Sequence, residues 1–238
     1  MKFGRLRSTS FAMMALAVAM AFNQSAQAGP PLICHPFEIG NAKSLPWAGS
    51  EWRAVKPDYD INRLVEDTLA LLTSDTPVIV RMETLRRATM YAVWAQRDSE
   101  VKLAAKNDKV AGQLLDRLMG RLKQSATGGK PNTLAMFDAG YFIESWRQAT
   151  DARSAPQMDG YGMIVKATNM RGGDASMEFA SALITSGRSD KTAHRAHLQK
   201  AVAGAPEGSL LAKNIVKHFS DKGRNLAELR ASVGLAKN

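Results

Sequence analysis

The sequence predicts an all-α protein in which antiparallel helical hairpins stack as a short right-handed α-solenoid, with a helical bundle as the alternative. Beyond Asp58, apolar residues recur every three or four positions, which is the period of a helix with one buried face. Prolines, glycines and capping residues divide this pattern into segments joined by short turns, and short turns favour antiparallel neighbours. No segment shows the alternating pattern of a strand meander.

Residues 1–28 have the layout of a secretory signal. Lys2, Arg5 and Arg7 form a basic start, residues 11–22 are apolar, and the segment ends in Ala-Gln-Ala. The apolar run of 12 residues is shorter than the ~20 that a membrane-spanning helix needs. We therefore expect a signal peptide, no membrane-spanning segment after its removal, and a periplasmic or secreted protein.

The charge balance is basic. The formal net charge is +10, of which +3 lies in the expected leader and +7 in the remainder. The cations are spread along the sequence and form no long run, so the composition favours a solvated basic surface over nucleic-acid binding. Weak attraction to anionic envelope surfaces is the consequence that we expect.

Cys34 is the only cysteine, which excludes a disulfide within the chain. A single thiol of this kind is either a small buried apolar residue or a reactive group that forms an intermolecular disulfide. No CxxCH segment occurs, which excludes covalent attachment of a c-type haem. We expect no cofactor.

Residues 29–57 are expected to form an ordered strap without a regular helix. Five prolines interrupt any helix there, while Phe37, Trp47 and Trp52 are unusual for a disordered segment. We expect these aromatic side chains to cover apolar surface on the first helices, and a binding platform for sugar or peptide is the alternative. The remainder, 58–238, is expected to be the helical domain.

The first two helices begin at recognisable capping residues. Asp60 precedes an apolar period that extends to about Thr73. Thr76 followed by Pro77 predicts a cap and a first-turn proline for the second helix, which extends to about Val93.

The second helix also carries four charged residues outside its apolar stripe: Arg81, Glu83, Arg86 and Arg87. Glu83 lies one turn from Arg86 and Arg87 and can pair with either. We interpret all four as solvated surface charges.

Seven more helical segments follow, separated by glycines and prolines. The third helix starts at Ser99 or Asp108 and has the strongest amphipathic pattern in the chain. The fourth opens at Pro131, and its bulky apolar residues predict a central position. The later helices are expected near 158–170, over 174–187 with Asp174 as the cap, from Ser189 or Asp190, from 206–209, and over 226–233.

The layout over 60–232 resembles tetratricopeptide-like and related α-helical repeat proteins, although their spaced Trp, Leu-Gly, Tyr, Ala and Pro signature over ~34 residues is absent. Two similar fragments, 138–143 and 159–164, lie 21 residues apart, which is too close for one repeated hairpin. Residues 33–47 resemble the opening of a family of exported, all-helical bacterial proteins without assigned function. These resemblances imply a helical fold and export, and no chemistry.

His194 and His197 are three residues apart and share a helix face, where they are candidate metal ligands. Lys191, Arg195 and Lys200 surround them and would repel a divalent cation. We therefore expect no metal there, and a basic, solvent-facing helix instead.

The motifs for nucleotide binding and nucleophilic catalysis are incomplete. Residues 127–131, Thr-Gly-Gly-Lys-Pro, lack the upstream glycine and the final hydroxyl residue of a P-loop. No GxSxG segment occurs, and Cys34 has only His35 beside it in sequence, which is poor geometry for a catalytic dyad. These motifs give no catalytic residue.

Glu144 is the remaining catalytic candidate. Glu144-Ser145, followed by 162–164 and later by Asn214-Ile215, resembles parts of the lytic transglycosylases, which cleave the cell-wall glycan with one buried glutamic acid. The glutamine after the methionine and the Ala-Tyr-Asn-Ala-Gly type segment of those enzymes are absent here.

The resemblance implies that Glu144 is a general acid, which requires an apolar pocket that favours the protonated carboxyl group. Tyr141 and Trp146 are positioned in sequence to supply such a pocket. The alternative is a helix glutamate that pairs with Arg147 or faces solvent.

Our leading hypothesis from the sequence is a non-catalytic exported scaffold, a helical-repeat protein whose groove binds an envelope protein or peptide. It rests on continuous helical hairpins and on the incomplete catalytic motifs. The alternative hypothesis is peptidoglycan cleavage by Glu144.

Overall fold

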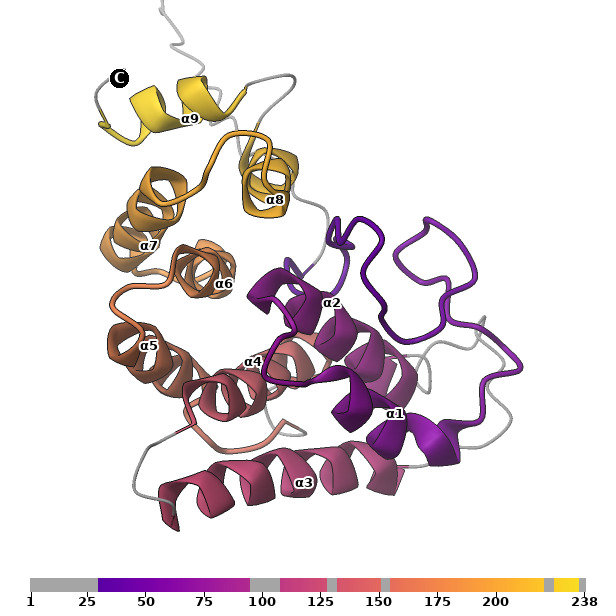
Figure 1. The fold of residues 1–238 in the computed structure, drawn as a ribbon. Helices are drawn as coiled ribbons and strands as arrows, with labels where there is room; N and C mark the ends of the chain where they lie inside the picture. The colour runs from indigo at the N-terminus through magenta and orange to yellow at the C-terminus, as the bar shows by residue number, and fades with distance from the viewer. Residues whose placement is uncertain (1–29, 95–107, 128–131, 151–154, 221–224, 236–238) are drawn as a thin grey trace, which may run out of the picture.

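The computed structural model describes residues 30–94, 108–127, 132–150, 155–220 and 225–235, and over these ranges the protein is helical without any strand (Figure 1). The expected leader lies outside the described residues. The helices are η1 (Ile61–Arg63), α1 (Leu64–Leu71), α2 (Val78–Thr89), the π-helix η2 (Met90–Trp94), α3 (Asp108–Thr127), α4 (Thr133–Ala149), α5 (Gly160–Met170), α6 (Ala175–Ser186), α7 (Lys191–Ala203), α8 (Leu210–Phe219) and α9 (Leu226–Ser232).

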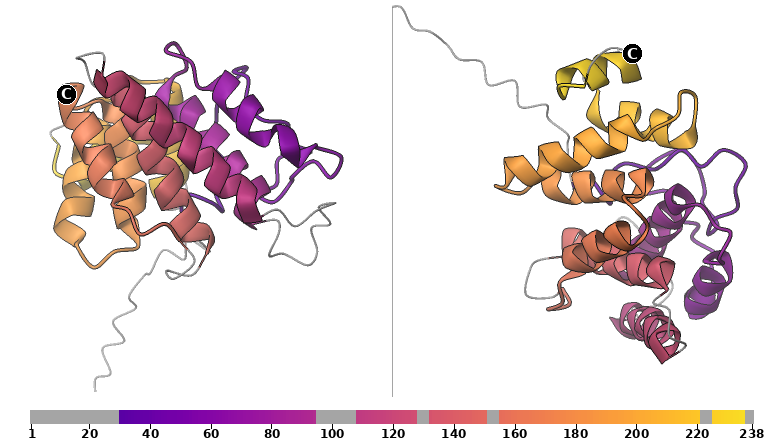
Figure 2. Two further views of the ribbon diagram at one scale, coloured as in Figure 1. Left: turned by 90° about the horizontal axis from the view of Figure 1, so that it is seen from below. Right: turned by 60° about the vertical axis from the view of Figure 1, so that its left-hand side comes forward.

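Successive helices pack against one another from α3 to α9, and the two views of Figure 2 show the same order. α2 departs from this pattern because it packs against both α4 and α6, and nearly all of its residues are buried. The helical class is therefore confirmed, while the right-handed solenoid stays a prediction. Among the described helices, none is both long enough and apolar enough to cross a bilayer.

Three predicted helix starts are confirmed by capping hydrogen bonds. The carboxylates of Asp60, Asp174 and Asp190 each accept a hydrogen bond from a backbone amide in the first turn that follows. Such a cap stabilises a helix by about 1 kcal/mol, because the first amides of a helix have no partner within it.

The prediction that Thr76 caps α2 is wrong. Pro77 occupies the capping position, and the Thr76 hydroxyl donates instead to the Leu71 carbonyl oxygen at 2.7 Å. The reason is that the last carbonyl groups of α1 also lack partners. Arg81 donates to the carbonyl oxygen of Thr73, which lies in the turn after α1.

The charged side chains of α2 are largely buried, so their interpretation as solvated charges is wrong. Glu83 and Arg86 are 0% exposed, and Arg81, at 2%, pairs with Asp138 of α4 at 2.5 Å. The predicted pairing of Glu83 is confirmed: Arg86 donates to both carboxylate oxygens at 2.8 and 2.9 Å, and Arg87 donates to one at 2.6 Å. Burial alone would raise the pKa of Glu83, but the two guanidinium groups hold it below its ordinary value.

These three residues, which we call the Glu83 cluster (Glu83, Arg86 and Arg87), bind the strap of residues 30–57. Glu83 accepts a hydrogen bond from the Phe37 amide at 3.0 Å. The two arginines donate to strap carbonyl oxygens. The acceptors are Ile33 and Trp52 for Arg86, and Leu45 for Arg87. The strap has no helix that would satisfy its backbone amide and carbonyl groups. Buried charged side chains therefore serve as the hydrogen-bond partners of several of these groups.

The aromatic side chains of the strap contact the protein. Trp47 lies under the guanidinium groups of the Glu83 cluster and meets Tyr91 edge-on at 5.9 Å between ring centroids. Trp52 meets Trp94 edge-on at 5.3 Å, and Phe37 is buried. These contacts support the covering role over a free binding platform.

The strap also reaches α8. The Asn214 amide group accepts from the backbone amide of Glu38 and donates to its carbonyl oxygen, both at 2.8 Å. Lys217 pairs with the Glu38 carboxylate at 2.8 Å, and Phe37 stacks on His218 with ring centroids 4.8 Å apart. The strap therefore joins the central helix α2 to the C-terminal part of the fold.

α4 and α5 cross at two glycines. A Cβ atom at Gly140 would lie 2.6 Å from the carbonyl oxygen of Gly160, and a Cβ atom at Gly160 would lie 2.6 Å from the carbonyl oxygen of Gly140. The similarity of the fragments 138–143 and 159–164 thus includes two glycines that touch each other through their backbones. This crossing presses the first turn of α5 against α4.

Gly140→Ala is expected to lower the free energy of unfolding by about 1–3 kcal/mol, because the added methyl group overlaps a backbone carbonyl that cannot easily move. Gly120→Ala on α3 is the control, since a Cβ there meets nothing within 4 Å. Helix propensity should leave that variant unchanged or more stable by up to about 1 kcal/mol. Chemical denaturation measures both, and equal stabilities would contradict the close crossing.

Glu83→Gln is expected to cost about 3–5 kcal/mol of unfolding free energy, because Arg86 then keeps its charge in the core without a carboxylate partner. Glu66→Gln on the exposed side of α1 serves as the control and should stay within about 0.5 kcal/mol of the wild type. Urea denaturation of the two variants gives the comparison. A loss below about 1 kcal/mol at Glu83 would show that the cluster does not hold the strap.

Candidate functional site

A continuous set of polar side chains from four consecutive helices lies on the α5–α7 side of the molecule, which the right-hand view of Figure 2 brings forward. α4 supplies two of them, α5 and α6 one each, the turn after α6 one, and α7 two. We call this set the polar network: Glu144, Arg147, Tyr161, Glu178, Arg188, His197 and Lys200.

Glu144 is buried, at 2% exposure, and accepts hydrogen bonds at both carboxylate oxygens. Oε1 accepts from the backbone amide of Tyr161 at 3.0 Å and from Arg147, and Oε2 accepts from Arg188 at 2.9 Å. The close glycine crossing makes the first contact possible, because it brings the N-terminus of α5 to α4. A carboxylate is favoured at that end of a helix.

These contacts suit a carboxylate that accepts hydrogen bonds, whereas a general acid must donate a proton. The pairing of Glu144 with Arg147, one of the two alternatives from the sequence, is present. Asn214, which the resemblance to lytic transglycosylases also singles out, uses its amide group on Glu38 and Leu210. The contacts of these two residues therefore support structural roles.

Tyr161, His197 and Glu178 form a hydrogen-bonded chain. Tyr161 Oη lies 2.7 Å from His197 Nε2, and His197 Nδ1 lies 2.5 Å from Glu178 Oε2. Lys200 Nζ is 3.2 Å from the other oxygen of Glu178. Burial alone would raise the pKa of Glu178, but the hydrogen bonds from His197 and Lys200 hold it below its ordinary value.

The ionised state of Glu178 determines where the protons lie. A carboxylate only accepts hydrogen bonds, so His197 Nδ1 carries the hydrogen that it donates to Glu178. In the neutral imidazole, Nε2 then accepts from the Tyr161 hydroxyl group. This order of hydroxyl, imidazole and carboxylate is that of the Ser-His-Asp triad, with a phenol in place of the serine.

Arg188 connects the two halves of the polar network. Its guanidinium carbon lies 4.7 Å from the centroid of the Tyr161 ring, while Nη2 bonds Glu144. A guanidinium group has five N–H donors, and no hydrogen bond other than the one to Glu144 joins the Arg188 guanidinium group to a described residue. Because the side chain is 40% exposed, its remaining donors are available to an anion beside Tyr161.

Lys191, Arg195 and Lys200 of α7 are exposed, as expected of a basic, solvent-facing helix, but the two histidines of this helix contact α6. His194 Nδ1 donates to the Ala182 carbonyl oxygen at 2.9 Å, while His197 bonds Glu178. The described residues contain no group of three or more side chains placed to hold a metal ion. Each histidine is instead fixed by its own partner on the neighbouring helix.

His218 lies in the core, where its ring contacts those of Phe37 and Phe179. Burial, with a smaller contribution from the neighbouring His35 and Lys217, lowers the pKa of His218 to about 3. The ring is therefore neutral and structural.

Cys34 is half-buried, and burial raises its pKa. A raised pKa favours the thiol over the reactive thiolate. This agrees with the interpretation of Cys34 as a packing residue.

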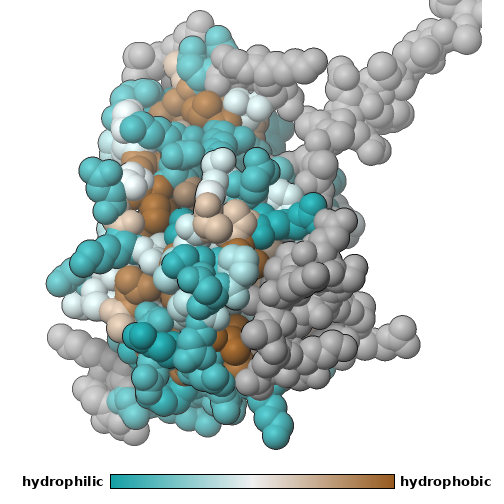
Figure 3. All heavy atoms as spheres, turned by 90° about the vertical axis from the view of Figure 1, so that its right-hand side faces the viewer, coloured by the Kyte–Doolittle hydropathy of each residue, from teal (hydrophilic) through white to brown (hydrophobic). Residues whose placement is uncertain are grey.

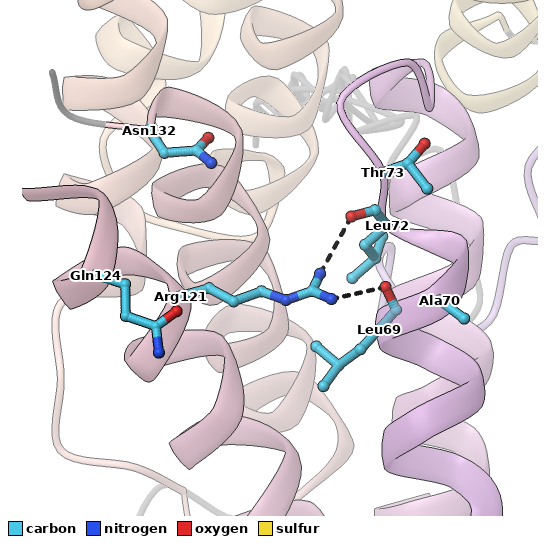
Figure 4. Close-up of a pocket in the computed structure, with 7 residues that line it drawn as sticks. All are labelled: Leu69, Ala70, Leu72, Thr73, Arg121, Gln124 and Asn132. Atoms are coloured by element: carbon cyan, nitrogen blue, oxygen red, sulfur yellow. Dashed lines mark hydrogen bonds between the residues drawn. The ribbon is translucent and has the colours of Figure 1, made fainter. Parts of the chain in front are cut away.

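An open depression of about 590 Å³ lies between α1 and α3. Figure 4 shows Arg121 extending across it to the carbonyl oxygens of Leu69 and Leu72, at 2.9 and 3.1 Å. These oxygens belong to the end of α1, where helix carbonyl groups lack partners. Arg121 is the one charged residue in the lining, and it bonds α1. The depression is therefore better explained as a packing contact between α1 and α3 than as a reaction site.

The sequence spacing gives little indication of the polar network. Tyr161 and His197 are 36 residues apart, Glu178 and His197 are 19 apart, and the three come from three helices. One signal exists, because Glu178 is the single charged residue of the otherwise uncharged helix α6. An isolated acid among apolar residues indicates a buried partner.

A scan against models of protein families and searches of curated proteins and of solved structures found no match to this chain. The resemblances to tetratricopeptide-like proteins and to exported bacterial proteins therefore stay predictions.

The contribution of His218 to stability is expected to fall as the pH decreases from about 7 to 5. The unfolded chain binds a proton at His218 near its ordinary pKa of 6.5, whereas the folded protein does so only at about 3. This one group contributes a slope that approaches about 1.4 kcal/mol per pH unit. His218→Phe keeps an aromatic ring against Phe37 and should reduce the slope.

Urea denaturation at a series of pH values measures the difference between the two proteins. Asp138, whose pKa burial raises to about 6, acts in the opposite direction but is present in both and cancels. Identical slopes for wild type and variant would contradict a buried neutral His218.

Proposed function

We propose that the protein is exported and binds an acidic segment of another envelope polypeptide through the basic surface of α5 to α8. The observation that carries this proposal is a local excess of positive charge. Residues 160–219 contain eight lysines and arginines and four aspartates and glutamates. A surface with such an excess attracts anionic partners and accelerates their association.

All four acidic side chains of this segment have hydrogen-bond or ion-pair partners within the protein. Asp174 and Asp190 cap α6 and α7, Glu178 bonds His197 and Lys200, and Glu207 pairs with Arg230 at 2.6 Å. They therefore give little compensation to the exposed cations.

Four cations of the segment are exposed and have no acidic partner among the described residues: Lys166, Lys191, Arg195 and Lys213. Lys191 and Arg195 are four residues apart on α7, so they share one face of that helix. An acidic side chain of a partner can approach both at once.

The surface offers little apolar area for an alternative mode of binding. Met170, at 43%, is the one large apolar side chain that is exposed among the described residues. The face on the side of the strap, which lies away from α5 to α7, is also mostly hydrophilic, with small separate apolar patches (Figure 3). Interfaces without an apolar centre depend on charge complementarity for recognition.

Export to the envelope is part of the same proposal and rests on the leader-like residues 1–28. A binding partner would accordingly be a protein or peptide of the envelope. The proposal keeps the binding role that the sequence favours and assigns it to a charged helix surface in place of a groove.

The double variant Lys191→Glu/Arg195→Glu is expected to weaken binding of a glutamate-rich peptide by about tenfold or more, because two attractive contacts become repulsive. Titration at low and high salt measures the effect, and salt should weaken wild-type binding as well. The matched control is Lys43→Glu/Lys109→Glu, which changes the net charge equally at exposed positions outside α5 to α8.

The control should bind as the wild type does. The same three proteins, immobilised, then test envelope extracts for a partner that only the α7 variant loses. Equal binding by the α7 variant and the wild type would contradict the proposal.

A further inference from the structure

We infer that Tyr161, His197 and Glu178 form a catalytic centre that hydrolyses phosphate esters, with Tyr161 as the nucleophile and Arg188 as the group that binds the phosphoryl oxygens. This inference goes beyond the proposed binding function and does not depend on it. It rests on the hydrogen-bonded chain of the polar network and on the position of Arg188 over the reacting side chain.

The chain supplies what a tyrosine nucleophile needs. A phenol is a poor nucleophile until a base removes its proton, and burial raises the pKa of Tyr161 further. His197 Nε2, 2.7 Å from the hydroxyl oxygen, is placed to accept that proton. Glu178 holds the ring in the required tautomer and stabilises the imidazolium that forms.

The other tyrosines lack this arrangement. Tyr59 donates directly to the Asp67 carboxylate at 2.9 Å, Tyr91 donates to the Pro46 carbonyl oxygen at 2.7 Å, and Tyr141 is fully buried. Tyr161 is partly exposed and bonds an imidazole. It is therefore the tyrosine of this chain that combines access with a base.

The surroundings favour phosphoryl transfer over acyl transfer. Acyl transfer needs backbone amides or similar donors that form an oxyanion hole beside the nucleophile. Here the Tyr161 amide is bound to Glu144 at 3.0 Å and the Gly162 amide to Asp159 at 2.8 Å, so neither is available. The free N–H groups next to the ring belong to Arg188, whose planar donors fit phosphoryl oxygens.

Glu144 is a positioning residue in this centre. Its carboxylate holds Arg188 at 2.9 Å and the first turn of α5 at 3.0 Å, so it fixes the cation and the nucleophile relative to each other. One carboxylate between Arg188 and Arg147 leaves a net positive charge at the site. That charge favours a phosphate ester anion.

The reaction has two steps. In the first, the Tyr161 hydroxyl proton moves to His197 Nε2, the phenolate oxygen forms a bond to phosphorus, and the bond from phosphorus to the leaving oxygen breaks. The leaving oxygen takes the proton from the imidazolium. In the second step, a water molecule gives a proton to His197 Nε2, and the water oxygen forms a bond to phosphorus. The bond between phosphorus and the Tyr161 oxygen breaks, and the Tyr161 phenolate takes the proton back from His197.

The purified protein is tested with p-nitrophenyl phosphate and bis(p-nitrophenyl) phosphate, which represent monoesters and diesters. Release of p-nitrophenolate from either probe is expected, together with a phosphoryl group on the peptide that contains Tyr161 after acid quenching. With Tyr161→Phe, the rate of p-nitrophenolate release should fall to the rate measured without protein. This variant keeps the ring and its contact with Arg188 but lacks the nucleophilic oxygen.

Tyr59→Phe is the matched control, since it also removes a hydrogen-bonded phenol and should keep full activity. His197→Gln should lower the rate by about 10²- to 10⁴-fold, the range for loss of a general base. Circular dichroism confirms that the variants remain helical. No release from either probe by the wild type, or equal release by Tyr161→Phe, would overturn the inference.

Discussion

The buried pairing of Glu83 with Arg86 and Arg87 is the interaction on which the rest of the structure depends. α2 lies at the centre of the fold, against α4 and α6, and the cluster gives this helix a polar side that binds the strap. A buried ion pair adds little net stability compared with apolar packing, but one of its charges left alone is costly. The cluster therefore specifies where the strap lies, and through the strap it connects α2 to α8.

A second constraint connects the fold to the candidate site. The backbone contact between Gly140 and Gly160 sets the distance between α4 and α5, and Glu144 occupies the space at the N-terminus of α5. Glu144 in turn binds Arg188, which lies over Tyr161. A change in the packing of the two glycines would accordingly change the position of the proposed nucleophile, although neither glycine belongs to the site.

The sequence predicts the features of this fold that depend on neighbouring residues. The helical period and the caps at Asp174 and Asp190 are local, because a cap bonds an amide two or three residues away. The burial of Arg86 is not local, since it depends on strap carbonyl groups more than thirty residues away in sequence. The chain from Tyr161 to Glu178 was missed for the same reason, because three separate helices contribute to it.

The two buried carboxylates of the polar network have different tasks, and this division explains why the site needs four helices. Glu144 on α4 fixes a cation, and Glu178 on α6 fixes an imidazole. The groups that they position, Tyr161 on α5 and His197 on α7, meet only when all four helices are packed in order. Because a misplacement of about 1 Å in such a site costs about 100-fold in rate, chemistry at Tyr161 requires a rigid arrangement of α4 to α7. Charge-based binding to the surface of α7 tolerates much looser packing, so the two proposed activities should respond differently to mutations that loosen the core.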